Sequence, residues 1–388
     1  MRITRQGLIA VITVFVMSRA LLIGITGVNI AITPPSDLPT AEHNIAEEQG
    51  EFDAAWHRWD VAYYAAIPTI GYWHASEGYE RQTVLFFPLV PLLIKILSTL
   101  TGLNTLWSGI VISNVAFFFA LLFLYDLILV EGKDSATAQR AIFYISFFPV
   151  AFHYFPARTE ALFLMLSLIA AHSARTGRWK WAALAGIFAS ATRLPGVFIA
   201  VFVGLEWLRA HDFHLTDIFN WQKWRTLLGD MRRDWLNIAC IVSIPLGLFS
   251  YMLYLWYRFG NPLAFLGGVA ENGVSSTVDR FVNLFAPVTL QSSILGIIVT
   301  ILLVLMLRPM AKQFNVNYSI YSVLSLILQY ITFVIHGIPR YVLGTFPFFM
   351  QLAVWGRFRA FHLAYVIICP AWLAINTLLW QRWFYVSG

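Results

Sequence analysis

Charged residues are scarce in this chain: Asp, Glu, Lys and Arg together make up 12% of its 388 residues. Soluble globular proteins carry about a quarter charged residues. Hydrophobic residues reach 59% and aromatic residues 16%, which is more apolar surface than a soluble fold of this length can bury. The composition excludes soluble, disordered, collagen-like and disulfide-stapled proteins. It predicts an all-α polytopic membrane protein, because helices satisfy their own backbone hydrogen bonds in lipid.

Several short motifs are also absent, and each absence removes a class of chemistry. The chain has only two cysteines, Cys240 and Cys369, which lie in apolar runs and indicate no disulfide framework. It contains no glycine-rich phosphate loop, no HExxH and no CxxC, so nucleotide chemistry and structural zinc lack support. The net charge of +6 fits the orientation of a membrane protein, and we expect no nucleic acid among its partners.

The N-terminal segment predicts a retained membrane helix rather than a signal peptide. Arg2 and Arg5 precede an apolar stretch over residues 7–32, which is longer than the hydrophobic region of a signal peptide and is interrupted by Arg19. A stretch of this length can cross the hydrocarbon core of about 30 Å. Because basic residues favour the cytoplasmic side, we expect the N-terminus there.

A polar loop rich in acidic residues follows at 32–83. Its only Lys or Arg residues are Arg58 and Arg81. Its nine acidic residues are Asp37, Glu42, Glu47, Glu48, Glu51, Asp53, Asp60, Glu77 and Glu80. Because the loop is poor in basic residues and follows a helix that leaves the cytoplasm, we expect it on the outer or luminal face.

Basic loops indicate how many of the later apolar segments cross the membrane. The apolar segments lie at about 84–100, 105–130, 138–152, 159–174, 181–192, 194–208, 237–258, 291–307, 318–335, 341–356 and 360–380. The basic loops contain Lys133 and Arg140, Arg175 to Lys180, Lys223 to Arg233, Arg308 and Lys312, and Arg357 and Arg359. All of these basic loops lie on the cytoplasmic side if segment 84–100 lies along the outer surface. If this segment crossed the membrane, the loops with Lys133 and with Arg175 would both lie outside. Pro88 and Pro91 also fit a short surface helix.

We therefore predict about eleven transmembrane helices, with the C-terminus outside. The chain is expected to form a single integral membrane domain over 1–388, with interfacial helices in an outer loop at 32–104 and a transmembrane bundle at 105–388. The segment from 181 to 208 is expected to be two short helices, because Thr192-Arg193-Leu194-Pro195 interrupts it.

Four groups of ionisable residues stand at the expected outer ends of these helices. Ionisable residues at membrane depth are costly and are functional candidates by default. Asp60 lies among the aromatic residues of 56–64, and Arg158 and Glu160 lie in the turn at 153–160. Arg193 lies in the broken helix pair. His336 and Arg340 lie in the turn at 336–341.

Each group also has a purely structural explanation. Asp60 can be a solvated acid within an interfacial aromatic belt. Arg158 and Glu160 can pair with each other or cap a helix, and Arg340 can extend to lipid headgroups. Together, however, acidic and basic groups gather at one membrane face. An arginine fork there suits a lipid phosphate, because a guanidinium group matches phosphate oxygens in a bidentate manner.

Five short motifs resemble those of the PIG-V-like mannosyltransferases. Trp59-Asp60 with Tyr64 and Gly71-Tyr72 resembles the family's W-D-x-x-x-Y…G-Y pattern. The later matches are Phe86-Phe87-Pro88-Leu89-Val90-Pro91-Leu92, Thr159-Glu160-Ala161-Leu162-Phe163-Leu164, Ala189-Ser190-Ala191-Thr192-Arg193 and Arg340-Tyr341-Val342-Leu343. Val90 and Arg158 stand where the family usually has Tyr. The motifs occur in the family's order along most of the chain.

The resemblance implies a glycosyltransferase of the GT-C type, with a catalytic acid and membrane-parallel helices in the first outer loop. The family uses a polyprenyl-phosphate-linked mannose, which is a dolichol derivative in eukaryotes. Its eukaryotic members add the second mannose of the glycosylphosphatidylinositol anchor. The chain is compact for that role, so a prokaryotic relative with another lipid-linked or glycolipid acceptor is an equal expectation. The location would be a prokaryotic plasma membrane, or the endoplasmic reticulum membrane in a eukaryote.

The sequence suggests a role for each candidate residue. Asp60 is the expected general base for the acceptor hydroxyl. A direct displacement with one base predicts inversion at the anomeric carbon of the mannose or related hexose. Arg340, with Arg193 or His336, is the candidate for the donor phosphate. The candidates for the remaining substrate contacts are Trp59, Tyr64, Arg158 and Glu160. No cofactor is expected, although Asp60 and Glu160 can alternatively share a divalent metal.

Two other classes of protein stay open at this point. A multi-pass lipid or sugar transporter or flippase also places charges in its helices. Transporters usually have paired halves with a site at the membrane midplane, whereas the charges here gather at the outer surface and the halves do not resemble each other. A pseudoenzyme or a non-catalytic subunit is the third possibility. In every case, membrane lipids are expected partners.

Overall fold

The computed structural model describes residues 2–32, 50–73, 83–266, 290–331, 335–384 and 386, and these ranges contain helices but no strand. The acidic residues Asp37, Glu42, Glu47, Glu48, Glu77 and Glu80, with Arg81, lie outside them. The α-helices are α1 (Arg5–Ile32), α2 (Glu51–Trp56), α3 (Asp60–Ile70), α4 (Leu89–Thr101), α5 (Thr105–Val130), α6 (Ser135–Ser146), α7 (Glu160–Arg175), α8 (Trp179–Ser190), α9 (Ile199–Ala210), α10 (Trp221–Arg233), α11 (Trp235–Val242), α12 (Leu246–Phe259), α15 (Leu290–Gln313), α16 (Val316–Ile331), α17 (Ile338–Tyr341), α18 (Phe346–Trp355) and α19 (Arg359–Gln381).

Short 3-10 helices join several of these elements. They are η3 (Thr83–Leu85), η4 (Ala151–Tyr154), η5 (Leu194–Phe198), η6 (Leu215–Phe219), η7 (Ala264–Leu266), η8 (Ile335–Gly337) and η9 (Val342–Gly344). The tighter 3-10 turn is common where a chain changes direction next to an α-helix. Three of them, η4, η5 and η8, flank the ionisable groups that the sequence analysis selected.

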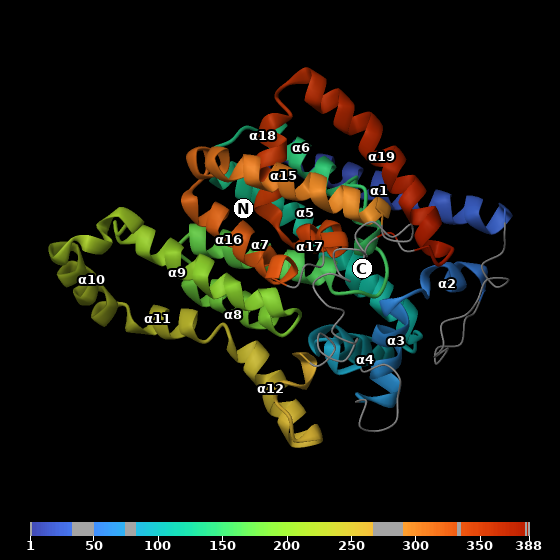
Figure 1. The fold of residues 1–388 in the computed structure, drawn as a ribbon, viewed down its shortest axis with the longest axis horizontal. Coiled ribbons are helices and arrows are strands. Elements are labelled where there is room, and N and C mark those ends of the chain that lie inside the picture. Colours follow the sequence, from blue (N-terminus) through green and yellow to red (C-terminus); the bar gives the residue numbers. More distant parts are fainter. Residues whose placement is uncertain are drawn as a thin grey trace.

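Helices α5 and α7 form the centre of the bundle. Helix α5 packs against α1, α3, α4, α6 and α7, and α7 packs against α8 and α9. Figure 1 shows α5 and α7 in the interior, with α1 and α19 along one edge. A helix that is apolar all round is a buried helix, and α5 fits this description because fifteen of its 26 residues are buried.

Among the described residues, four helices are long and apolar enough to cross a membrane: α1, α5, α15 and α19. The pair α11 and α12 passes the same test when it is taken as one span bent by 44°. The prediction of about eleven crossings is therefore not confirmed. Helix α4 has 13 residues, fewer than the roughly 20 that a crossing requires, which agrees with the expected surface position of this segment.

The predicted break before Pro195 is present. Helix α8 ends at Ser190, η5 follows, and α9 begins at Ile199. Pro195 occupies the first turn of η5, where its missing N–H costs nothing. Gly196 is required there, because a Cβ atom at this position would lie 2.3 Å from the carbonyl oxygen of Ala189. The break places Arg193 in extended backbone between two short helices.

A second charged group holds the opposite end of α7. Arg175, the last residue of α7, forms ion pairs with Glu131 and with Glu206 at the end of α9. The Tyr318 hydroxyl donates to Glu131 over 2.6 Å. These contacts join the ends of α5, α7, α9 and α16. Helix α7 is about 24 Å long at 1.5 Å per residue. The contacts of Arg175 hold its last turn, and thereby help to fix the position of Glu160 at its first residue.

Close packing of α8 against the start of α12 holds the break in place. The Ser190 hydroxyl donates to the carbonyl oxygen of Ile244 over 2.7 Å. A Cβ atom on Gly247 would lie 2.0 Å from the carbonyl oxygen of Ile187 and 2.3 Å from Oγ of Ser190. Only glycine allows this approach.

We predict that Gly247→Ala lowers the thermal unfolding temperature of the detergent-solubilised protein. Overpacking of this kind costs about 1–3 kcal/mol, because α12 has to move away from α8. Gly27→Ala is the matched control, since nothing lies within 4 Å of the position that its Cβ would take. Equal unfolding temperatures for the two variants would contradict the close contact.

Candidate functional site

Two carboxylates and three guanidinium groups meet at one end of the bundle. Oδ2 of Asp60 lies 2.6 Å from Nη2 of Arg158 and 2.8 Å from Nη1 of Arg340. Oε1 of Glu160 accepts a hydrogen bond from Nε of Arg340 and lies 3.2 Å from Nη1 of Arg193. Nε of Arg158 lies 3.8 Å from Oε2 of Glu160. We call these five residues the carboxylate–arginine cluster.

Separate parts of the chain supply the five side chains. Asp60 is the first residue of α3 and Glu160 the first of α7. An acid in the first turn interacts favourably with the positive end of a helix dipole. Arg158 precedes α7, Arg193 lies in the break between α8 and η5, and Arg340 lies in α17. The four groups selected from the sequence therefore each contribute to one cluster.

Burial differs sharply within the cluster. The side chain of Glu160 is 0% exposed and that of Arg158 is 2%, whereas that of Asp60 is 33% exposed. Three guanidinium groups against two carboxylates leave one positive charge in excess. Because these five side chains sum to one positive charge, the cluster favours an anion beside it. Asp60 is its most accessible member.

The arginines also set the charge state of Asp60. Burial alone would raise the pKa of the Asp60 carboxyl, but the neighbouring guanidinium groups of Arg158 and Arg340 outweigh it and leave the pKa below its ordinary value. The carboxyl group is therefore ionised at neutral pH. Both arginine bonds end on Oδ2, and Oδ1 has no hydrogen-bond partner among the residues that the structure describes.

Trp59 holds Asp60 through a strained backbone. Its φ of 55° and ψ of −134° form a combination that only glycine adopts readily, and such strain is found mainly at functional sites. Nε1 of Trp59 donates to the carbonyl oxygen of Trp380 over 3.3 Å. Its ring lies 5.3 Å from that of Trp383. This support by Trp380 and Trp383 was not predicted from the sequence, where the available signal was their place at the end of the last apolar segment.

Tyr64 is buried in a row of aromatic side chains, which we call the aromatic wall; its members are Tyr64, Phe86, Tyr72, Tyr251 and Tyr254. Its side chain is buried, and its ring makes an edge contact of 5.0 Å with that of Phe86. The hydroxyl of Tyr72 donates to the carbonyl oxygen of Phe86 over 2.9 Å. The ring of Tyr72 then lies 5.7 Å from those of both Tyr251 and Tyr254 on α12. Aromatic contacts thus connect α3 with α12.

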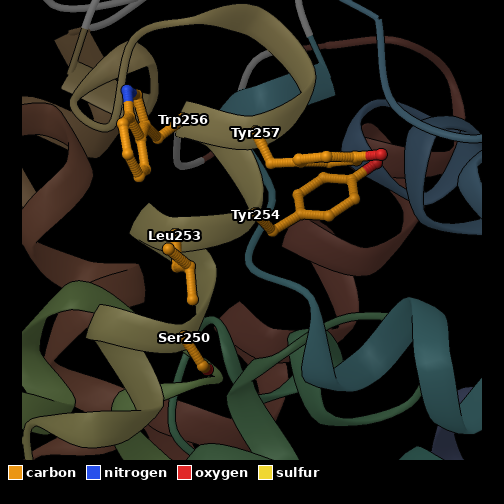
Figure 2. Close-up of a pocket in the computed structure, with 5 residues that line it drawn as sticks. All are labelled: Ser250, Leu253, Tyr254, Trp256 and Tyr257. Carbon is orange, nitrogen blue, oxygen red and sulfur yellow. The ribbon is translucent and has the colours of Figure 1, made fainter.

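An apolar groove runs along α12. It has a volume of about 670 Å³ and is lined by Ser250, Leu253, Tyr254, Trp256 and Tyr257. Figure 2 shows the rings of Tyr254 and Tyr257 extending to one side of the helix and that of Trp256 to the other. This groove is mostly apolar and does not include the carboxylate–arginine cluster. The aromatic wall joins the two.

Two further residues, for which no role of their own was predicted from the sequence, position the arginines. Nη1 of Arg158 donates to Nδ1 of His153 over 2.9 Å. Because a guanidinium group can only donate, Nδ1 of His153 must accept, so this imidazole is neutral. The guanidinium group of Arg193 lies 4.7 Å from the ring centre of Tyr341, a cation–π contact. His153 begins the turn at 153–160, and Tyr341 belongs to the motif Arg340-Tyr341-Val342-Leu343.

His336 lies on η8, four residues before Arg340, and its side chain is partly buried. Burial lowers the pKa of its imidazole below the ordinary value. The ring is therefore neutral at neutral pH. It can donate a hydrogen bond to a phosphate oxygen but adds no positive charge, so Arg193 and Arg340 are the stronger candidates for charge stabilisation.

The residues present do not fit a divalent metal. Within the described ranges, no three His, Cys, Asp or Glu side chains lie close enough together to hold a metal ion. Arginines contact both carboxylates of the cluster, and their positive charge opposes a second cation there. A divalent metal shared by Asp60 and Glu160 would have to displace arginine contacts from both carboxylates.

The chain is an all-helical, multi-pass membrane protein with a buried acid–arginine site at one end. It belongs to the mannosyltransferase (PIG-V) family, whose model matches residues 9–265. This confirms the resemblance found in the sequence motifs, and membership supports glycosyl transfer as the activity. Arg340 lies beyond the matched residues, yet the fold brings it to Asp60 and Glu160 inside them. No curated protein matches the chain.

Solved structures of an oligosaccharyltransferase from Archaeoglobus fulgidus are similar to the chain. The complex with zinc and sulfate gives a TM-score of 0.44 at 11% identity, over 95% of this chain and 53% of that one. The complex of AglB from the same organism with an inhibitory peptide and a dolichol-phosphate gives 0.41 at 12% identity, over 96% and 56%. The chain thus spans about half the length of these proteins.

We predict that Glu160→Gln strongly destabilises the protein, because it leaves three buried guanidinium groups around a neutral amide. Removing one partner of a buried ion pair costs about 3–5 kcal/mol. The unfolding temperature in detergent should fall well below that of Asp60→Asn, whose side chain is 33% exposed. Adding Arg193→Gln to Glu160→Gln should recover part of the loss. Equal unfolding temperatures for the two single variants would contradict this charge balance.

Proposed function

We propose that the protein is an inverting glycosyltransferase that moves mannose, or a related hexose, from a polyprenyl-phosphate sugar to a lipid-linked or glycolipid acceptor. The observation that carries this proposal is the excess positive charge of the carboxylate–arginine cluster beside one accessible, ionised carboxylate. The cluster offers both groups that such a transfer needs, a site for an anionic leaving group and a base. Family membership supports the sugar and the reaction class.

Arg193 and Arg340 are the proposed binding groups for the donor phosphate. Their side chains are each 9% exposed, so a phosphate that reached them would interact in a medium of low dielectric constant, where charge stabilisation is strong. The leaving phosphate already departs as an anion. It needs charge stabilisation rather than a proton, so the reaction does not require the second carboxylic acid of a glycosidase.

Asp60 is the proposed general base. Its two arginine partners fix Oδ2 and keep the carboxyl group ionised, which leaves Oδ1 to accept the proton of the acceptor hydroxyl as that hydroxyl attacks the anomeric carbon. General-base catalysis contributes roughly 10²–10⁴ in rate. A single base and a single displacement give inversion at the anomeric carbon. Glu160 is fully buried, so its proposed role is to hold the arginines rather than to touch the sugar.

The groove on α12 is the proposed path of the polyprenyl chain. Leu194, next to Arg193, packs against the buried cluster that includes Tyr251 and Leu255 of α12, as Tyr72 does. A phosphate at Arg193 can therefore continue into a chain that follows the apolar side of this helix. Trp59 is the proposed ring for sugar stacking, because it precedes the base directly and is only partly buried.

The proposed site lies on the outer or luminal face. The N-terminus precedes α1 on the cytoplasmic side in this arrangement, and the outer loop with α2 and α3 follows α1 on the far side of the membrane. This orientation is the one that the basic loops favour. It places Asp60 where a polyprenyl-phosphate sugar that has crossed the membrane is available.

We predict that Asp60→Asn abolishes sugar transfer and leaves the protein folded in the membrane. The amide cannot accept the proton, so the rate should fall by about 10²–10⁴. The measurement is transfer of radiolabelled mannose from polyprenyl-phosphate mannose to candidate lipid acceptors by purified protein.

Glu51→Gln is the matched control, because it removes one negative charge from the same outer loop outside the cluster; its activity should equal that of the wild type. Wild-type transfer by Asp60→Asn would rule out the base assignment. Movement of labelled donor across vesicles without a labelled product would instead indicate a transporter.

We predict that Arg158→Gln moves the acid limb of the pH profile of kcat/KM to higher pH. One of the two guanidinium groups that hold the Asp60 pKa below its ordinary value is then lost. The pKa of the base rises, and a larger fraction of it is protonated at each acidic pH. Arg178→Gln, outside the cluster, is the control and should leave the profile unchanged. An unmoved acid limb in Arg158→Gln would show that Asp60 is not the titrating base.

A further inference from the structure

Helix α10 has one face in the protein and one face exposed. Leu227 is buried, and Trp224 and Met231 pack partly against the core. A neighbouring face of the helix presents Trp221, Arg225, Leu228 and Arg232, which are all exposed. Their spacing of four, three and four residues places them on a single stripe of the helix. The exposed stripe therefore alternates large apolar side chains with arginines.

This stripe is unusual for a surface in contact with water. Trp221 is 67% exposed, Leu228 is 50%, and Phe219, just before α10 in η6, is 99% exposed. Exposed large apolar side chains that sit together usually indicate an interaction surface. The guanidinium group of Arg225 lies 6.0 Å from the ring centre of Trp221. Tryptophan and arginine together are typical of the headgroup layer of a membrane.

The charge of α10 indicates which headgroups would suit it. The helix contains four basic residues, Lys223, Arg225, Arg232 and Arg233, against the single acid Asp230. Two of the arginines lie in its last turn, where the helix dipole favours positive charge. An amphipathic helix with a basic polar side binds at the interface of membranes that contain anionic lipid.

The continuation of the chain places α10 next to lipid. Only Asp234 separates it from α11, and α11 with α12 is apolar enough to span a membrane as one bent segment. Trp235 at the start of α11 is 61% exposed, as expected of a lipid-facing residue. Figure 1 shows α10 at the far end of the molecule from α2 and α3, so it lies away from the carboxylate–arginine cluster.

We propose that η6 and α10 lie in the headgroup layer of the membrane face opposite the carboxylate–arginine cluster, and that Arg225 and Arg232 bind the phosphates of anionic lipids there. Trp221, Leu228 and Phe219 extend toward the acyl chains, and Leu227 keeps the helix attached to the bundle. The inference does not depend on the proposed transfer reaction. It assigns this surface to a membrane lipid rather than to a protein.

The test uses the full chain in nanodiscs of phosphatidylcholine mixed with phosphatidylglycerol. Cys240 and Cys369 are replaced by serine, and Phe219→Cys is labelled with a fluorophore that brominated lipids quench. Bromine is placed on one lipid in one sample and on the other lipid in the next, so the ratio of quenching reports the local lipid preference. With the wild-type arginines, brominated phosphatidylglycerol should quench the probe more than brominated phosphatidylcholine does. Added salt should reduce this difference in quenching.

Arg225→Gln and Arg232→Gln should each lower that preference about fivefold, the equivalent of about 1 kcal/mol for one basic residue at an anionic surface. Arg357→Gln with Arg359→Gln is the control, because it removes two exposed cations from another loop and should leave the preference unchanged. A probe quenched by aqueous iodide and by neither lipid would place the stripe in water and overturn the proposal. Equal quenching by both lipids would overturn the assignment to anionic phosphate.

Discussion

Pairing of the charges around Glu160 is the interaction on which the site depends. A carboxylate with no exposed surface is tolerated in an apolar bundle only when cations surround it, and here Arg158, Arg193 and Arg340 do so. These arginines come from the start of α7, the break before η5 and the short helix α17. Satisfying one buried acid therefore draws three distant parts of the chain together. Asp60 then joins through two of the same arginines.

The rest of the fold holds these pieces at fixed positions. Ion pairs hold helix α7 at both ends, through Glu160 at its first residue and Arg175 at its last. Gly247 lets α12 approach α8, which supports the break that holds Arg193. The same approach brings the aromatic residues of α12 toward Tyr72 and the outer loop. Stability and the proposed binding of a phosphate with a long apolar chain thus use the same contacts.

Much of this arrangement was predictable from the sequence. Scarce charge predicted the membrane bundle, Pro195 predicted the break, and the family motifs selected Asp60 and its partners. The number of crossings stays a prediction, because a short helix buried among others is as apolar as one in lipid. The pairing of Arg158 and Arg340 on a single oxygen of Asp60, and the support of Trp59 by the C-terminal tryptophans, depend on tertiary contacts. No spacing in the sequence encodes them.

The central claim is that the excess positive charge of the carboxylate–arginine cluster receives the phosphate of a polyprenyl-phosphate donor. A structure of the protein with a polyprenyl phosphate bound in a nanodisc tests this most directly. The account predicts the phosphate within hydrogen-bond distance of Arg193 or Arg340, with the isoprenoid chain along the groove on α12. A phosphate bound elsewhere, with both arginines still paired with Glu160 and Asp60 as they are here, would contradict it.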